Sequence, residues 1–253
     1  MEIKLAKDPI LYKEPRRFLF YGAEKIGKTS IVTELDNAAI LDLDDGSGFK
    51  ECIRYQIRSL TDLEDFRDAH IAAGYPHKFI VVDTITKLEE FVHMLATRMY
   101  MGTNQGKGFN KDKAGKILPE SEWDMVVDVL GQNGYRWFTL AWRYIMDEIV
   151  LPMGNESTRF IFIGHVKDKF IDPNSIGKTV STKELNLTGK NKDITLQHYS
   201  DCNAYAYRTS QGELEFSFKS DSLDVSAGSR IGPVGQVIKA KDLWKTLYPD
   251  SVK

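Results

Sequence analysis

The sequence predicts an α/β protein in which a mostly parallel central sheet is flanked by helices. Short apolar runs rich in β-branched residues alternate with longer amphipathic segments, the pattern of strand–helix units around a parallel sheet. Four runs are apolar almost throughout, as expected of strands that are buried on both faces. These predicted strands are Arg17–Tyr21, Ala39–Leu43, Phe79–Asp83 and Arg159–Gly164.

The segments between the apolar runs predict the helices. In Thr61–Ala73, Thr61 is expected to be the N-cap, Glu64 to complete a capping box, and Gly74 to end the helix. A longer helix over Thr86–Met101 is predicted from apolar residues at helical spacing. Four other helices are predicted. The first begins at Gly27-Lys28-Thr29 and ends near Asn37, and two more cover about 121–131 and 135–150. The last is short, Asp242–Leu247.

After residue 165 the pattern changes. The segment Lys167–Lys192 is polar and shows no clear period, which predicts a mobile loop. Two alternating runs, Asn203–Thr209 and Glu213–Lys219, flank a short turn that contains Gly212, which predicts a C-terminal β-hairpin.

Composition places the chain among ordinary globular proteins. It has 253 residues, of which 42% are hydrophobic and 28% charged, so the core needs no disulfide or structural metal. Cys52 and Cys202 have no metal-type spacing and are expected to be reduced thiols in the cytoplasm. No apolar run approaches the roughly 20 residues of a membrane helix, and no secretory signal is expected. The net charge of −2 argues mildly against nucleic-acid binding.

A phosphate-binding loop is the strongest motif in the sequence. Residues 22–29 match G-x-x-x-x-G-K-[ST] and lie between a predicted strand and a predicted helix. Backbone N–H groups of such a loop wrap phosphates, the lysine binds the outer phosphates, and the hydroxyl ligates Mg²⁺. The residues expected to bind ATP here are Gly22, Ala23, Glu24, Lys25, Ile26, Gly27, Lys28, Thr29 and Ser30.

Carboxylates follow two of the predicted strands. Phe79–Asp83 is four apolar residues and an acid, a Walker B pattern that places Asp83 beside Thr29 as the second Mg²⁺ ligand. Asp42 and Asp44 end another strand, and Asp44 is the preferred candidate to orient or deprotonate the attacking water. The alternative is that these acids only cap the strand and begin a turn.

His165 ends the last buried run, Ile161-Phe162-Ile163-Gly164-His165. Its side chain could contact the γ-phosphate of a nucleotide and transmit its hydrolysis to the polar segment that follows. The alternative is a histidine that is only hydrogen-bonded structure. Together with Lys28, Asp44 and Asp83, His165 completes the predicted catalytic set.

The order of these motifs resembles the core of the RecA-like recombinases over about residues 16–235, most nearly the compact phage ATPases of single-strand annealing and recombination. The resemblance implies that Asp44 stands where the family has a catalytic glutamate, one methylene longer. It also implies that Asp83 with Thr84 matches the family's Walker B acid and hydroxyl. His165 stands where many members have a glutamine that senses the γ-phosphate.

The resemblance has implications for assembly as well. Lys167–Lys192 falls where the family has a mobile DNA-binding loop, and Arg230 resembles a late basic residue that some members lend to a neighbour's nucleotide. A RecA-like ATPase domain is expected over residues 17–253, preceded by an N-terminal arm over residues 1–16. The arm could dock on a neighbouring subunit of a homo-oligomer or pack on its own domain. A phage-encoded member would act in the cytoplasm of a bacterial host.

Local charge supports a nucleic-acid partner more than the net charge does. Lys107–Lys116 combines lysines and glycines with Phe109, and Lys167–Lys192 is also rich in lysine. Flexible loops of this kind suit single-stranded DNA, because cations follow phosphates and aromatic rings stack on bases. The alternative is a solvated surface loop.

Three functions remain open from the sequence. The first is an ATPase that binds single-stranded DNA in recombination or annealing, with ATP and Mg²⁺ as ligands. The second is a P-loop phosphotransferase, such as a nucleotide or polynucleotide kinase, which ranks lower because the candidate loops carry lysine rather than the arginine of a phosphate lid. The third is a slow ATP-dependent switch that controls a protein partner, which the short side chain of Asp44 keeps open.

Overall fold

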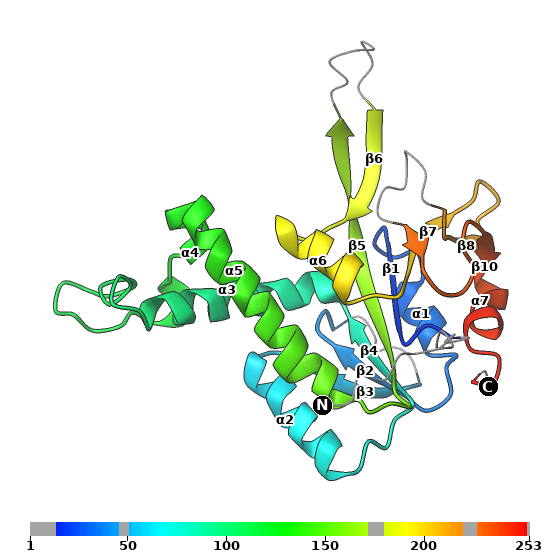
Figure 1. The fold of residues 1–253 in the computed structure, drawn as a ribbon, viewed down its shortest axis with the longest axis horizontal. Helices are drawn as coiled ribbons and strands as arrows, with labels where there is room; N and C mark the ends of the chain where they lie inside the picture. Colours follow the sequence, from blue (N-terminus) through cyan, green and yellow to red (C-terminus); the bar gives the residue numbers. More distant parts are fainter. Residues whose placement is uncertain (1–13, 46–50, 172–179, 220–226, 252–253) are drawn as a thin grey trace, which may run out of the picture.

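A sheet of mostly parallel strands forms the centre of the computed structural model, which describes residues 14–45, 51–171, 180–219 and 227–251 (Figure 1). The order across the sheet is β10-β8-β7-β1-β5-β4-β2-β3, with β6 paired to β5 and β9 paired to β7. The strands from β7 to β3 are parallel, whereas β8 and β10 extend the sheet in antiparallel fashion. The strands are β1 (Arg17–Gly22), β2 (Ala38–Asp42), β3 (Ile53–Gln56), β4 (Phe79–Asp83), β5 (Arg159–Ile171), β6 (Val180–Leu185), β7 (Cys202–Arg208), β8 (Leu214–Ser217), β9 (Gly228–Ser229) and β10 (Val237–Lys239).

The central strands are buried on both faces, which confirms the four predicted strands. Every residue of β2 and β4 is buried, as is all of β1 except Arg17. Apolar runs of this kind require a cover of helices on each side of the sheet. The fold class predicted from the sequence, a mostly parallel sheet flanked by helices, is therefore confirmed.

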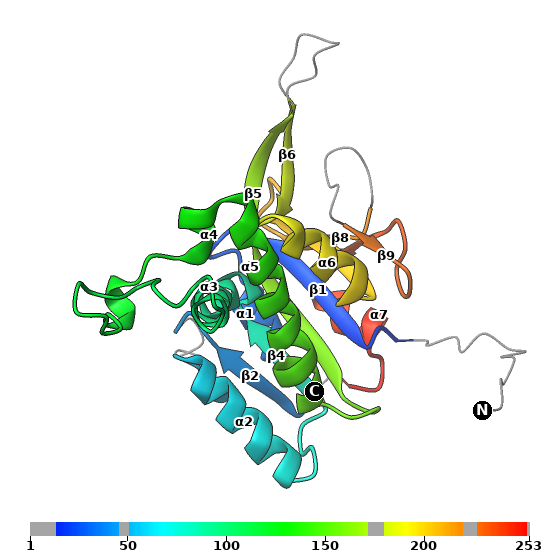
Figure 2. The ribbon, with the colours of Figure 1, turned by 60° about the vertical axis from the view of Figure 1, so that its left-hand side comes forward.

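Helices cover the two faces of the sheet in different ways (Figures 1 and 2). One face carries α2, α3 and α5, whose apolar side chains join Leu19 and Tyr21 in one core cluster. The other face carries the short α1 and the C-terminal α7, which pack with Phe18 and Phe20. The helices are α1 (Lys28–Val32), α2 (Leu60–Ala72), α3 (Ile85–Met101), α4 (Val126–Leu130), α5 (Gln132–Tyr144), α6 (Lys190–His198) and α7 (Ala240–Leu247).

The predicted capping box at the start of α2 is wrong. The N-cap is Ser59, whose hydroxyl accepts a hydrogen bond from the Asp62 amide at 3.1 Å. The Asp62 carboxylate accepts in turn from the amide of Arg58 at 2.8 Å, so the reciprocal pair uses an aspartate instead of Glu64. The helix begins at Leu60, because Ser59, two residues before Thr61, already caps it by accepting from the Asp62 amide.

Three other predicted helices need adjustment. The helix after the phosphate loop ends at Val32, earlier than predicted, and α3 matches its prediction closely. The predicted helix over 121–131 consists of a single 3₁₀ turn, Glu120–Glu122, and the short α4. The last long helix begins at Gln132 and changes into a π-helical segment, Ile145–Val150, before it ends.

The predicted loop over Lys167–Lys192 is wrong where the structure describes it, because this segment contains two paired strands and the start of α6; residues 172–179 lie outside the described residues. Strand β5 continues past His165 to Ile171 and pairs with β6 in an antiparallel register from Val166↔Leu185 to Ile171↔Val180. Figure 1 shows this hairpin projecting beyond the sheet. The two strands are rich in polar residues. They therefore lack the apolar alternation that predicts a strand, and the sequence pattern predicted a loop.

The second predicted hairpin, formed by β7 and β8, is confirmed, with Gly212 in its turn at a φ of +81°. The predicted N-terminal arm, residues 1–16, lies mostly outside the described residues, which start at Glu14. Among the described residues, no helix combines the length and apolar character needed to cross a bilayer.

Helix α7 packs against α1, the helix that follows the phosphate loop. The indole Nε1 of Trp244 donates a hydrogen bond of 2.6 Å to the carbonyl of Ile31 in α1, and the ring is only 2% exposed. Its ring also lies edge-on to Phe18 of β1, with centroids 6.1 Å apart. The Ile31 carbonyl also accepts a hydrogen bond of 3.3 Å from the Glu34 amide, so the indole is a second donor to the C-terminal end of α1.

Trp244→Ala is expected to lower the free energy of unfolding by about 3–5 kcal/mol, since it removes a large buried ring and a partner of a buried carbonyl. Trp244→Phe, which keeps most of the ring, should cost less, about 1–3 kcal/mol. Urea denaturation at equilibrium measures both. Lys245→Ala, an exposed neighbour in α7, is the control and should change stability by less than about 0.5 kcal/mol. Equal stability of wild type and Trp244→Ala would contradict this account of α7.

Candidate nucleotide-binding site

The phosphate loop joins the end of β1 to the start of α1. Gly22 ends the strand, where a Cβ atom would lie 2.4 Å from the carbonyl oxygen of Ala206 on β7. Gly27 precedes the helix with a φ of +107°, in the left-handed region that favours glycine. The two glycines of the motif are thus required by close packing at one position and by backbone conformation at the other.

Lys28 occupies the interior of this loop. Its ammonium donates hydrogen bonds to the carbonyls of Gly22 at 3.0 Å and Ala23 at 2.7 Å, and the residue is 6% exposed. Burial lowers the pKa of the lysine, whereas the carboxylates of Asp83, Glu24 and Asp44 act in the opposite direction. No carboxylate among the described residues lies within ion-pair distance of this buried ammonium, which is therefore well suited to bind an anion that enters the loop.

Thr29 and Asp83 lie in direct contact, as the motifs predict. The Thr29 hydroxyl donates a hydrogen bond of 2.7 Å to Oδ2 of Asp83 at the end of β4. Strand β5 separates β1 from β4 in the sheet, so the contact reaches across one intervening strand. Burial raises the pKa of Asp83 to about 6; Asp42 and Asp44 add to the increase, and Thr29 and Lys28 oppose it.

A second cluster lies beside this pair. The Thr84 hydroxyl donates a hydrogen bond of 2.9 Å to Oδ2 of Asp44, and Nε2 of His165 lies 3.4 Å from the same oxygen. The Asp83–Thr84 peptide bond is cis. Burial alone would raise the pKa of Asp44, but the hydrogen bonds from His165 and Thr84 lower it overall. Asp44 is therefore ionised at neutral pH and held in one orientation.

His165 lies where β5 leaves the parallel sheet. It is the last residue of β5 that pairs with β1, opposite Gly22, and its amide donates a hydrogen bond of 2.9 Å to the Thr86 hydroxyl. Nδ1 of the ring is buried and makes no hydrogen bond to any described residue. No sequence motif indicates Thr86, because its role depends on the long-range packing of α3 against β5.

Asp42 and Asp44 differ in their surroundings although both follow the same apolar run. The carboxylate of Asp42 lies 3.3 Å from the guanidinium of Arg54 on β3 and accepts a hydrogen bond from the Asp44 amide at 3.2 Å. Asp42 thus fixes the backbone at the end of β2, whereas the Asp44 side chain faces the phosphate loop. The predicted preference for Asp44 over Asp42 is consistent with this arrangement.

The predicted residues of both clusters line one cavity of about 250 Å³. The cavity opens at the carboxyl ends of the parallel strands, where ligands bind in α/β sheets. Its lining residues are Glu24, Lys25, Gly27, Lys28, Thr29, Asp44, Asp83, Thr84 and His165. Lys28, Asp44, Asp83 and His165, the four residues predicted to be catalytic, are therefore brought together.

Arg230 lies elsewhere. It follows β9, which pairs with the first residues of β7, and its guanidinium donates a hydrogen bond of 2.9 Å to the carbonyl of Gln197. This position is at the edge of the sheet opposite the phosphate loop. The predicted role of Arg230 toward a neighbouring subunit's nucleotide stays a prediction.

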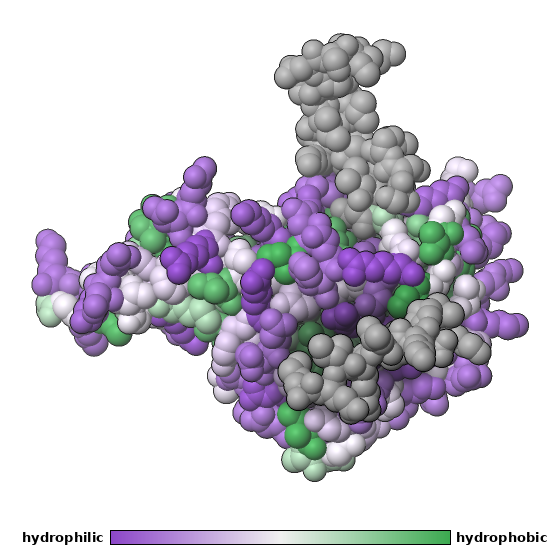
Figure 3. Space-filling model, viewed as in Figure 1, coloured by the Kyte–Doolittle hydropathy of each residue, from purple (hydrophilic) through white to green (hydrophobic). Residues whose placement is uncertain are grey.

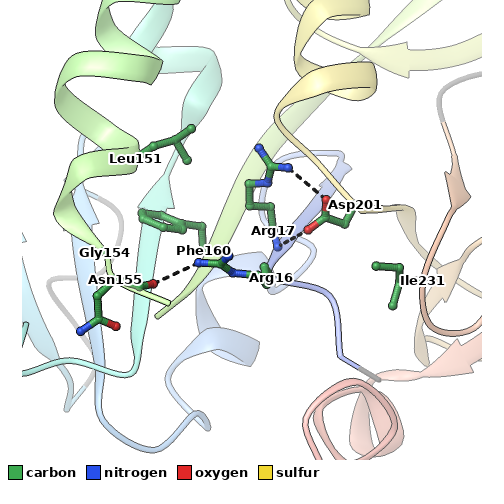
Figure 4. Close-up of a pocket in the computed structure, with 8 residues that line it drawn as sticks. All are labelled: Arg16, Arg17, Leu151, Gly154, Asn155, Phe160, Asp201 and Ile231. Carbon is green, nitrogen blue, oxygen red and sulfur yellow. Dashed lines mark hydrogen bonds and ion pairs between the residues drawn. The ribbon is translucent and has the colours of Figure 1, made fainter. Parts of the chain in front are cut away.

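A larger cavity, about 380 Å³, lies near the beginnings of β1 and β5 (Figure 4). Arg17 forms an ion pair of 3.2 Å with Asp201, and the guanidinium of Arg16 donates to the carbonyl of Asn155. Both cations are thus engaged within the protein. This edge is also the amino-terminal side of the parallel strands, which is not where such sheets bind ligands.

The residues of the phosphate-loop cavity fit a magnesium ion. Mg²⁺ prefers oxygen ligands and binds proteins through one or two side chains together with substrate phosphates and waters. The Thr29 hydroxyl and the Asp83 carboxylate, 2.7 Å apart, are such a pair. Burial, with a smaller contribution from Asp42 and Asp44, raises the pKa of Asp83 and so disfavours its charged form, which a bound cation would stabilise. Among the described residues no cluster of three or more His, Cys, Asp or Glu could hold a metal, and a site shared with phosphates needs none.

Asp83→Asn is expected to raise the free energy of unfolding near neutral pH by about 1–3 kcal/mol, because it removes a charge that burial disfavours. The folded pKa of about 6 exceeds the unfolded value of about 3.9. The stability linked to protonated Asp83 is thus complete below about pH 4 and lost as pH rises through about 6.

Urea denaturation from acidic to neutral pH measures this loss, which Asp83→Asn should abolish. Asp65→Asn, at an exposed position in α2, is the control. A variant that keeps the pH dependence of the wild type would exclude Asp83 as its source.

Comparison with known proteins gives one family. The family model described as AAA domain matches residues 14–212, which include the phosphate loop, Asp44, Asp83 and His165. A comparison with curated proteins found no match. The matched range covers most of the chain and all of the cavity that the geometry indicates. The protein therefore belongs to the AAA domain family and carries its P-loop, ATPase-like domain.

Proposed function

We propose that this protein is a RecA-like ATPase that hydrolyses ATP with Mg²⁺ and binds single-stranded DNA in recombination or strand annealing. ATP hydrolysis is supported by two residue pairs that meet in one cavity beside the phosphate loop. The pairs are Thr29 with Asp83 and Asp44 with His165. The first pair suits the binding of the nucleotide with Mg²⁺, and the second suits the activation of the attacking water.

The phosphate loop binds the triphosphate. Backbone N–H groups of the loop and the Lys28 ammonium contact the phosphate oxygens, with glycines allowing the backbone to approach. Thr29 and Asp83 would hold Mg²⁺, which would stabilise negative charge on the phosphates. Binding of a cation keeps Asp83 ionised, although burial raises its pKa to about 6 in the free protein.

Asp44 prepares the attacking water. Its pKa is lowered, so it is ionised and able to accept a proton or a hydrogen bond from water. The Thr84 hydroxyl, at 2.9 Å, fixes the orientation of the carboxylate. His165, at 3.4 Å from the same oxygen, links the acid to β5 and so to the projecting hairpin.

Single-stranded DNA is proposed to bind mainly along the segment 102–125, the arm between α3 and α4 that projects from the body (Figures 1 and 2). Its lysines are exposed, and none forms an ion pair with an acid that the structure describes; they are Lys107, Lys111, Lys113 and Lys116. Phe109 packs edge-on against Tyr100 at 5.3 Å. The surface of the arm is largely hydrophilic (Figure 3).

The second predicted DNA segment offers less free charge. In the β5–β6 hairpin and the start of α6, Lys183 pairs with Asp168, and Lys192 lies 2.7 Å from Glu184. Lys167 also approaches Glu184, at 3.7 Å. Internal pairing of these lysines weakens the electrostatic case for this segment. A homo-oligomer, in which Arg230 reaches the nucleotide of a neighbouring subunit, is part of the same proposal.

ATP hydrolysis in the presence and absence of single-stranded DNA tests the proposal. The expected result is Mg²⁺-dependent hydrolysis that DNA stimulates, with Lys28→Ala reduced to background, because the lysine binds the outer phosphates. Replacement of the four arm lysines by glutamine should remove the stimulation and leave basal hydrolysis intact. Hydrolysis that DNA does not affect would exclude the DNA half of the proposal, and transfer of labelled γ-phosphate to a nucleotide or DNA end would favour a phosphotransferase.

Asp44→Asn is expected to lower kcat about 10²- to 10⁴-fold with little change in ATP affinity, since it removes the group that accepts the proton of water. Asp44→Glu, which restores the length of the family's residue, tests whether the short side chain slows the reaction. Steady-state hydrolysis and separate nucleotide titrations measure both effects. A much faster Asp44→Glu enzyme would favour the slow-switch function, and an unchanged Asp44→Asn rate would exclude Asp44 from catalysis.

A further inference from the structure

Arg208 lies against the outside of the phosphate loop, and no motif predicted it. A methyl group built on Gly27 would lie 3.5 Å from Nη2 of Arg208 and 3.7 Å from Leu214. Arg208 is the last residue of β7, and β7 pairs with β1 up to Gly22 opposite Ala206. The register of two neighbouring strands thus brings a guanidinium to the loop that binds phosphate.

The β7–β8 turn holds this guanidinium in place. Nη1 of Arg208 donates a hydrogen bond of 2.5 Å to the carbonyl of Gly212. The turn is closed by the Thr209 amide, which donates to the carbonyl of Glu213 at 2.9 Å. The Glu213 side chain forms an ion pair of 2.7 Å with Lys239 on β10. Arg208 is therefore positioned by a braced hairpin and is exposed to solvent.

Arg208 has no acidic partner among the residues that the structure describes. Arg17, Arg54 and Arg98 each pair with a carboxylate. The one described hydrogen bond of the Arg208 guanidinium is to a backbone carbonyl, so its charge and its planar face are available to a ligand.

The position of Arg208 indicates which part of a nucleotide it meets. Strand β1 has β5 on one side and β7 on the other. The groups that suit Mg²⁺ and the attacking water, Asp83, Asp44 and His165, all belong to the β5 side. The γ-phosphate must lie toward those groups, because hydrolysis occurs there. The nucleoside end then extends in the other direction, over the β7 side where Arg208 lies.

We propose that Arg208 binds the nucleoside part of ATP, with its guanidinium stacked on the base. The inference rests on the proposed binding of ATP in the phosphate loop. The planar, weakly hydrated guanidinium stacks flat on an aromatic face, whereas the ammonium of a lysine offers only a compact, strongly hydrated charge. Arg208 is thus a nucleotide-recognition residue that lies outside the phosphate motif and contributes no contact to the outer phosphates.

Titration of wild type, Arg208→Ala and Arg208→Lys with Mg²⁺–ATP and with Mg²⁺–tripolyphosphate tests this inference. Arg208→Ala should weaken ATP binding about 10-fold, the effect of one lost base-stacking contact. Binding of tripolyphosphate, which has no nucleoside, should not change. Arg208→Lys keeps the positive charge but should lose most of the ATP affinity. Arg98→Ala, at a half-exposed arginine at the far end of α3, is the matched control and should bind both ligands as the wild type does.

Two results would overturn the inference. Equal loss of ATP and tripolyphosphate binding in Arg208→Ala would show a phosphate contact, and unchanged ATP binding would show no contact. A wild-type protein that binds neither ligand would instead remove the proposed function together with this inference. Thermal unfolding of each variant, expected to match the wild type because Arg208 is exposed, separates lost binding from lost folding.

Discussion

The register of the parallel strands is the constraint on which the rest of the structure depends. Because β1, β5 and β4 are buried on both faces, their side chains can carry no polar chemistry until the strands end. The alignment of Gly22 with His165 and of Asp83 with Ile163 makes those ends coincide at one edge. A shift of one residue in either pairing would exchange the faces of a whole strand and separate Thr29 from Asp83.

At this edge of the sheet the protein buries charged side chains that a ligand of opposite charge would stabilise. Lys28 is buried against carbonyls, and Asp83 is buried beside two other carboxylates. The opposite displacements of their two pKa values have one cause, the low polarity of the site, which disfavours both charged forms. A nucleotide bound with a cation would supply opposite charges to both groups and so stabilise their charged forms.

Short sequence patterns predicted the elements whose structure depends mainly on neighbouring residues in the chain. The phosphate loop, β4 with Asp83 and the helix α3 follow from short runs whose character does not depend on distant residues. The β5–β6 hairpin was missed because its lysines and acids compensate each other only across the strand pair, as Lys183 and Asp168 do. Thr86 and Arg208 were missed for a similar reason, since each reaches the site through the packing of elements far apart in the sequence.

The continuity of β5 has a mechanical consequence. One strand of thirteen residues runs from the core, past His165, to the outer part of the hairpin without a turn or a glycine after Gly164. Six residues beyond His165 extend about 20 Å at the usual strand rise. Because the strand is continuous, a rotation at His165 would displace its far end, at Ile171, more than its base.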